Sequence, residues 1–197
     1  MGLSLVERAG AALTEGDVAR AVSTLYEGLG GGDPDPAARE LLGGLLLFDD
    51  DLRGARREFE LAFRQWKEVG QPRRAALVAA TLADLHTSWF GNRIAGQGWV
   101  ARGRRMLGPE GRCVEQGYLE LAVIACEAGA VHRLEAAATV ALDLAREFND
   151  AELEVRALSD SGYAPVVQGR LSEGFARLDE AMASLSAGRS ETQRRRV

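Results

Sequence analysis

The residues able to do metal or acid–base chemistry are few and widely separated in this 197-residue chain. The two histidines, His86 and His132, have no partner at the His-x-x-x-His or Glu-x-x-His spacing that places two zinc ligands on one helix face. The cysteines Cys113 and Cys126 stand 13 residues apart. That is about 20 Å on one helix, too far for a disulfide. We therefore predict no metal site and no disulfide.

The nucleotide and nucleophile patterns are also missing. No Gly-x-x-x-x-Gly-Lys-Ser/Thr loop is present, and the glycine-rich stretch 28–32 follows a predicted helix where a dinucleotide site would need a strand. We interpret His86, beside Asp84, as a partly buried polar residue and Cys126 as a small buried hydrophobe. The sequence thus predicts no catalytic residue and no cofactor.

Composition excludes other classes of function. The hydrophobic fraction of 46% is ordinary for a folded protein, and a net charge of −5 argues against indiscriminate binding to nucleic acid or anionic membrane. No apolar run approaches the roughly 18–20 residues of a membrane span, and no secretion signal opens the chain. We expect a cytoplasmic protein that binds neither membrane nor nucleic acid directly. The arginine clusters are interpreted as solvated helix faces.

Helical periodicity, caps and breakers predict ten helices and no strands. The run Asp49–Asp51 is a capping turn, with Asp51 accepting hydrogen bonds from the amides of the helix that follows. We predict one helical domain over residues 1–186 and a disordered basic tail over 187–197. The predicted helices cover about 3–14, 18–29, 36–48, 52–69, 72–89, 93–107, 112–128, 131–148, 151–168 and 171–186.

Small residues recur at fixed distances from the turn inside each helix pair. The turn residues are spaced by 34, 41, 38 and 40 positions. Of the 20 positions at −7, 0, +5 and +12 around them, 17 are Gly or Ala, whereas 55 such residues in 197 would predict roughly six. The turns taken as zero are Gly16, Asp50, Gly91, Gly129 and Gly169.

This spacing resembles the tetratricopeptide repeat (TPR) over residues 2–186. The resemblance implies an all-α, TPR-like solenoid of about five antiparallel helical hairpins. Residues 91–107, 115–119 and 169–182 further resemble the helical-repeat region of actinobacterial LuxR-type transcriptional regulators. In that family the repeats usually precede a helix-turn-helix domain, which implies a sensory or scaffold role in transcription regulation.

The TPR resemblance implies a concave groove that binds a protein or peptide and is lined by the first helix of each pair. Two aromatic residues, Trp89 and Tyr163, are the expected anchors if the groove is open. The alternative is that irregular repeat lengths close the groove and bury both. The groove positions carried over are Glu40, Leu47, Phe48, Thr81, Leu85, Ser88, Trp89, Gln116, Leu119, Val123, Arg156, Ser159 and Tyr163.

Two other classes of function stay open. One is a small-molecule effector-binding or enzymatic helical domain with a closed site built from Asp84, His86, Arg156 and Tyr163. The other is a structural protein that self-associates, for example as a homodimer, through exposed end helices such as the one that carries Leu3, Leu5 and Val6.

Overall fold

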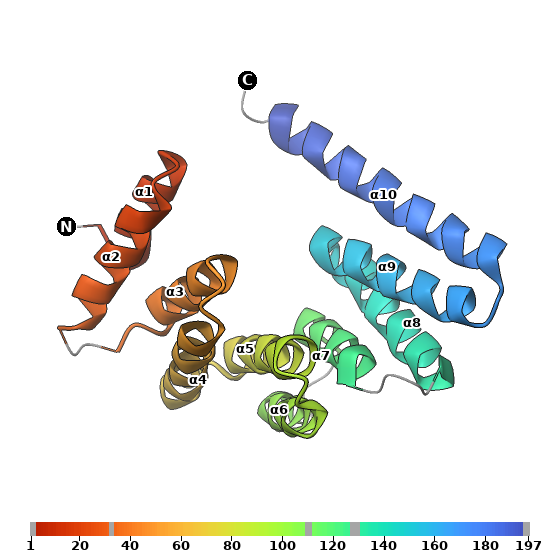
Figure 1. Ribbon diagram of the computed structural model, residues 1–197, viewed down its shortest axis with the longest axis horizontal. Helices are drawn as coiled ribbons and strands as arrows, with labels where there is room; N and C mark the ends of the chain where they lie inside the picture. The colour runs from red at the N-terminus through yellow and green to blue at the C-terminus, as the bar shows by residue number, and fades with distance from the viewer. Residues whose placement is uncertain (1–2, 32–33, 109–111, 127–130, 195–197) are drawn as a thin grey trace.

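The computed structural model describes residues 3–31, 34–108, 112–126 and 131–194, and every regular element in these ranges is helical. The helices stack as antiparallel hairpins into a curved solenoid whose two ends flank the open side of the arc (Figure 1). The predicted all-α hairpin solenoid is confirmed. The elements are α1 (Leu5–Thr14), α2 (Val18–Leu29), α3 (Pro36–Phe48), α4 (Leu52–Glu68), α5 (Pro72–Asp84), the π-helical segment η1 (Leu85–Trp89), α6 (Arg93–Leu107), α7 (Val114–Cys126), α8 (Val131–Phe148), α9 (Ala151–Val167) and α10 (Leu171–Arg194).

The solenoid has two layers. Each helix packs against the next along the chain, and the odd-numbered helices also touch one another, as α1 on α3, α5 on α7 and α7 on α9. In Figure 1 the odd-numbered helices α3, α5, α7 and α9 follow the inner side of the arc. Residues from these helices can therefore converge on one concave surface.

Left-handed backbone closes the hairpins where the repeat pattern places its turns. Gly16, Asp50, Gly91 and Gly169 have φ values of +79°, +59°, +63° and +80°. Glycine reaches this region without a Cβ clash, which explains its recurrence there. The remaining predicted turn, Gly129, lies outside the described residues.

Side-chain caps begin most of the helices. The Asp51 carboxylate accepts a hydrogen bond from the Gly54 amide at 2.9 Å, which confirms the predicted cap. At α1 the Ser4 hydroxyl and the Glu7 carboxylate form a reciprocal capping box. The same N-cap role is filled by Asp17, Asp35, Asn92 and Asp150.

The recurrent small residues lie at the closest helix crossings. Ala9, Ala21, Ala55 and Ala62 are completely buried. At Gly174 an added Cβ would stand 2.7 Å from the Gly162 carbonyl oxygen, so the backbones of α9 and α10 are in contact there. Small size at these positions sets how closely the layers approach.

The structure differs from the sequence prediction in two segments. The helix predicted over 72–89 changes from α to π geometry at Leu85, a type of irregularity that often occurs near functional sites. Helix α10 continues to Arg194, well into the segment predicted to be a disordered tail; residues 195–197 lie outside the described part of the chain.

Candidate functional site

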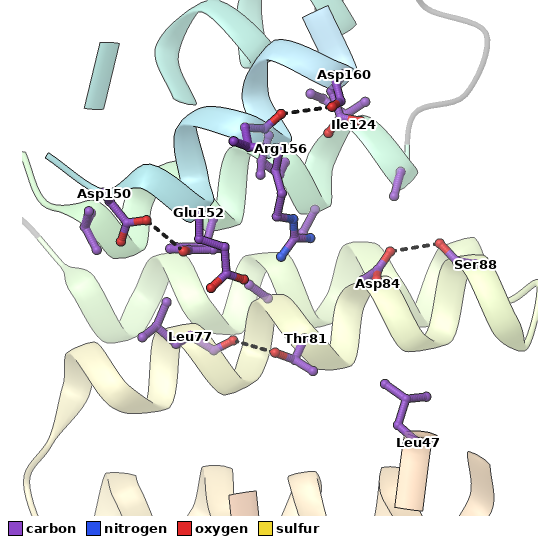
Figure 2. Close-up of a pocket in the computed structure, with 18 of the residues that line it drawn as sticks. Leu47, Leu77, Thr81, Asp84, Ser88, Ile124, Asp150, Glu152, Arg156 and Asp160 are labelled. Atoms are coloured by element: carbon purple, nitrogen blue, oxygen red, sulfur yellow. Dashed lines mark hydrogen bonds between the residues drawn. The ribbon is translucent and has the colours of Figure 1, made fainter. Parts of the chain in front are cut away.

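A cavity of about 790 Å³ opens on the concave side of the arc. It is lined by residues of the odd-numbered helices, of η1 and of the turn before α9 (Figure 2). We call it the concave cavity. Its lining consists of Glu40, Leu47, Leu77, Ala80, Thr81, Asp84, Ser88, Val114, Tyr118, Leu121, Ala122, Ile124, Ala125, Asp150, Glu152, Val155, Arg156, Ser159 and Asp160.

One wall is held in place by the start of α9. The Asp150 carboxylate caps α9 by accepting a hydrogen bond from the Leu153 amide at 2.8 Å. The same oxygen accepts a hydrogen bond from the Tyr118 hydroxyl of α7 at 3.1 Å. Burial, together with the negative charge of Asp150, raises the pKa of the Tyr118 hydroxyl. Tyr118 therefore stays neutral and joins two helices of the wall.

The opposite wall comes from α3, α5 and η1. The Ser88 hydroxyl donates to the Asp84 carboxylate at 2.8 Å, one turn earlier. The indole nitrogen of Trp66 in α4 donates to the Glu40 carboxylate of α3 at 2.9 Å. The donors that hold these two carboxylates are thus uncharged, so neither contact is an ion pair.

Asp160 and Arg156 lie one helical turn apart on α9. Burial raises the pKa of the Asp160 carboxyl to about 6; Arg156 acts in the opposite direction, and Asp84 adds to the increase. The Arg156 guanidinium lies 5.7 Å from the centre of the Tyr118 ring. In Figure 2 its side chain extends from α9 toward the helices of the other wall.

The structure places some of the expected groove residues at this cavity. Leu85 and Leu119 do not belong to any accessible surface: they are 1% and 0% exposed and pack in the hydrophobic core, which corrects their assignment. Both lie on the face of their helix that meets neighbouring helices rather than the cavity. The expected residues that do line it are Glu40, Leu47, Thr81, Ser88, Arg156 and Ser159.

The expected aromatic anchors lie outside the cavity lining but are accessible. Trp89 is 52% exposed and Tyr163 is 60% exposed, so neither is buried by closure of the arc. Tyr163 follows Ser159 by one turn of α9 and therefore extends the cavity-facing stripe of that helix. Phe48, at 83% exposure, and the half-buried Gln116 are not part of the lining, and Val123 faces a separate shallow pocket beside α6.

The alternative four-residue site is not assembled. Asp84 and Arg156 line the concave cavity, whereas His86 and Tyr163 do not. His86 is buried against Phe90, with ring centroids 5.7 Å apart, and burial followed by the nearby charge of Arg56 lowers its pKa. The prediction was of a partly buried polar residue; the imidazole is buried, and its lowered pKa favours the neutral form.

Sequence reasoning missed the acidic character of the cavity. Asp150, Glu152 and Asp160 were not selected, because the repeat alignment supplies one set of positions per helix and ignores the turn before α9. A polar stripe on one helix face could have been predicted from three charged residues spaced four apart, Glu152, Arg156 and Asp160.

Metal-binding geometry is not found in the described ranges, where no group of three or more His, Cys, Asp or Glu side chains could hold an ion. The sequence does place Gly54 and Glu60 at the sixth and twelfth positions from Asp49, as in a calcium loop. However, Asp51 caps α4, and Arg53 and Arg57 occupy ligand positions. The run therefore begins a helix instead of enclosing a cation.

Both cysteines are buried and therefore poorly placed to react with solutes. Cys113 and Cys126 are 2% and 1% exposed. The Cys126 sulfur lies 3.2 Å from the Thr87 hydroxyl, in contact between α7 and η1. The interpretation of Cys126 as a buried small hydrophobe is confirmed, with the hydroxyl contact as an addition.

Arginine side chains stack on aromatic rings in several places. Arg102 lies 4.6 Å from the Trp99 ring centre, Arg56 lies 5.4 Å from that of Phe90, and the Arg74 guanidinium covers Trp66. Others form ion pairs, such as Arg104 with Glu120 at 2.9 Å. Arginines of these clusters are thus exposed to solvent and also contact neighbouring side chains.

Comparison with known proteins identifies the fold alone. No family model matches the chain, and no curated protein sequence matches it. The crystal structure of BtubC (BKLC) from P. vanneervenii is similar, with a TM-score of 0.70 over 94% of this chain and 80% of that chain. This chain has a helical-repeat fold. The sequence identity is 17%, so the similarity carries no functional assignment. None of the described helices is long and apolar enough to cross a membrane.

Proposed function

We propose that this chain is a non-enzymatic, TPR-like interaction module that binds a peptide or partner segment in the concave cavity. The observation that carries the proposal is the convergence of α3, α5, α7 and α9 on one cavity with both apolar and polar lining. A volume of about 790 Å³ lies within the usual range of binding pockets. Apolar side chains can bury a ligand's anchors while the surrounding carboxylates and hydroxyls orient it.

We also propose a cytoplasmic role as the sensory or scaffold part of a LuxR-like transcriptional regulator. Support comes from the resemblance of residues 91–107, 115–119 and 169–182 to the repeat region of those regulators. Co-expression with a candidate helix-turn-helix protein and measurement of operator-reporter output would test it. A reporter that ignores the presence of this chain would remove the regulatory part while leaving the interaction module intact.

The binding proposal can be tested with random 12-residue peptides displayed on phage. Clones enriched on the wild-type chain would be synthesised and titrated by fluorescence polarisation against Thr81→Trp and Thr139→Trp. These two threonines are a matched pair, because both are exposed and both donate to the carbonyl four residues earlier, at 3.3 and 2.8 Å. Only Thr81 lines the concave cavity.

We expect Thr81→Trp to weaken binding about tenfold or more, because an indole would occupy cavity volume, and Thr139→Trp to stay within about twofold. Trp89→Ala/Tyr163→Ala should also weaken binding without loss of helicity if the exposed aromatics extend the site. Failure to enrich any clone, or clones that bind Thr81→Trp like wild type, would refute the proposal.

A small-molecule effector is a second candidate for the same cavity, whose volume of about 790 Å³ could hold one. A thermal-shift screen of a metabolite library would test for effector binding. Thr81→Trp, whose indole would fill part of the cavity, would serve as the control. A compound that stabilises wild type and not Thr81→Trp would support an effector site. The absence of any stabilising compound would argue against it.

Self-association through an exposed end helix is a third candidate, and the exposed apolar residues favour the C-terminal helix over the N-terminal one. Leu5 and Val6 are partly buried against the core, so of the predicted N-terminal surface only Leu3, at 66% exposure, projects freely. On α10, Phe175 and Met182 are 54% and 58% exposed. Sedimentation velocity at increasing concentration would test this surface, and a wild-type chain that stays monomeric would exclude it.

A further inference from the structure

The lining of the concave cavity carries an excess of negative charge. Five carboxylates reach it from three helices and one turn, whereas Arg156 is the single basic residue among the lining side chains. The carboxylates belong to Glu40, Asp84, Asp150, Glu152 and Asp160.

The five cavity carboxylates lack the arginine partners that many other carboxylates of the described residues have. In the described residues no ion pair involves any of the five cavity carboxylates. The pairs outside the cavity include Arg20–Glu15, Arg39–Glu58, Arg56–Glu60, Arg104–Glu120, Arg112–Glu147, Arg146–Glu154 and Arg170–Glu173. A concave, low-dielectric wall that carries unneutralised charge of one sign focuses its potential on the enclosed volume.

The polar contacts within the cavity leave this charge in place. Asp84 accepts from a serine hydroxyl, Glu40 from an indole, and Asp150 from a phenol and a backbone amide. All of these donors are neutral. The raised pKa of Asp160 agrees with this picture, since its ionised form is disfavoured by burial and by the proximity of Asp84.

Apolar residues complete the lining beside the carboxylates. Leu47, Leu77, Leu121 and Ile124 reach the cavity from both walls. Lysine and arginine have long aliphatic stems that pack on such surfaces while their charged ends reach carboxylates. The lining therefore matches a chain segment that presents cationic ends together with aliphatic surface.

We infer that the concave cavity selects a positively charged protein segment, rich in lysine or arginine and carrying aliphatic side chains. This inference rests on the proposed function and specifies its partner. Charge complementarity would speed encounter and reject acidic segments, which would face uncompensated carboxylates.

Three fluorescein-labelled 12-residue peptides of matched length and leucine content would test it, with Lys, Gln or Glu at every other position. The groove variant Glu152→Gln/Asp160→Asn would be compared with Glu27→Gln/Glu68→Gln. Glu27 and Glu68 are exposed and lie outside the cavity lining, and both double variants remove the same formal charge.

We expect the Lys peptide to bind at least about tenfold more tightly than the Gln peptide, and the Glu peptide to bind more weakly than either. Glu152→Gln/Asp160→Asn should weaken Lys-peptide binding about 5- to 20-fold, and the control pair by about twofold at most. Raising NaCl from about 50 to 500 mM should reduce the Lys-peptide affinity and leave the Gln peptide nearly unchanged.

The possible results distinguish failure of the charge inference from failure of the proposed interaction module. Equal binding of the Lys and Gln peptides, lost in Thr81→Trp, would keep the interaction module and overturn the charge inference. Equal loss in both double variants would also overturn it, because the effect would then come from net charge alone. If none of the three peptides binds and the phage library yields no Thr81-dependent clone, both proposals fail.

Discussion

The stability of two glycine variants on α6 would test how closely the layers pack at the centre of the solenoid. Gly96 and Gly98 are two residues apart, so Gly→Ala gains the same helix propensity, about 1 kcal/mol, at either site. A Cβ on Gly96 would stand 2.2 Å from the Thr87 hydroxyl oxygen, 2.9 Å from the Cys126 sulfur and 3.0 Å from the Ala83 carbonyl oxygen. A Cβ on Gly98 would meet only one atom of the flexible Arg102 guanidinium, at 3.4 Å.

The propensity gain cancels when the two variants are compared, and the remainder is the packing cost. Thr87 can rotate away, but this breaks its contact with Cys126, and the Ala83 carbonyl belongs to helix backbone that cannot yield alone. Overpacking of this kind costs about 1–3 kcal/mol, and we expect the upper part of that range. For a chain of this size each kcal/mol shifts Tm by about 2–4 °C, so Gly96→Ala should melt about 6–12 °C below Gly98→Ala.

Far-UV circular dichroism during thermal and urea unfolding measures both variants against wild type. Gly98→Ala should be slightly more stable than wild type, and Gly96→Ala should be less stable than Gly98→Ala with unchanged helicity at low temperature. A Gly96→Ala protein as stable as Gly98→Ala would refute the reasoning, because it would show that α5, η1 and α7 leave room at this crossing.

Three further perturbations test a largely buried ion pair, a helix cap and a partly buried acid. Glu58 is 3% exposed, and its carboxylate lies 2.7 Å from the Arg39 guanidinium. Glu58→Ala should lower the free energy of unfolding, measured in urea, by about 3 kcal/mol, because Arg39 would lose this carboxylate partner. A loss below about 1 kcal/mol would contradict this expectation. Asp51→Ala should lower the unfolding free energy by about 1 kcal/mol through loss of the α4 cap, and Asp51→Asn should restore most of it. Because burial raises the folded-state pKa of Asp160 from 3.8 to about 6, the wild type loses stability as pH rises between these values. Asp160→Asn should therefore be about 1–2 kcal/mol more stable than wild type at pH 7, after allowance for solvent screening, and about equally stable below pH 4; equal stability at pH 7 would contradict the assigned burial.

The local structure of this chain follows closely from its sequence. Aspartate and serine caps, glycine at the turns and the helical periodicity predicted nearly all helix bounds to within a few residues. The small residues were also informative, because only Gly and Ala permit the observed helix approach, as at Ala55 and Ala141, both completely buried. These are short-range or strictly periodic effects, and a single sequence carries them in full.

The inward or outward position of a residue was less predictable where repeat lengths vary. Leu85 and Leu119 carry over to groove positions of a regular repeat, yet both are buried. The helix that carries Leu85 changes from α to π geometry at that residue. An alignment of regular repeats assumes α-helical geometry throughout and does not include such a change.

The sequence by itself determined the hairpin order, the turns, the caps and the crossings, because each depends on residues within one repeat. Only the tertiary structure decided that Glu40, Asp84, Asp150, Glu152 and Asp160, which are up to 120 positions apart, face one cavity with a single arginine among them. Their convergence depends on the curvature that accumulates over several repeats. Curvature is the sum of small rotations at each helix crossing, and no single repeat contains that sum.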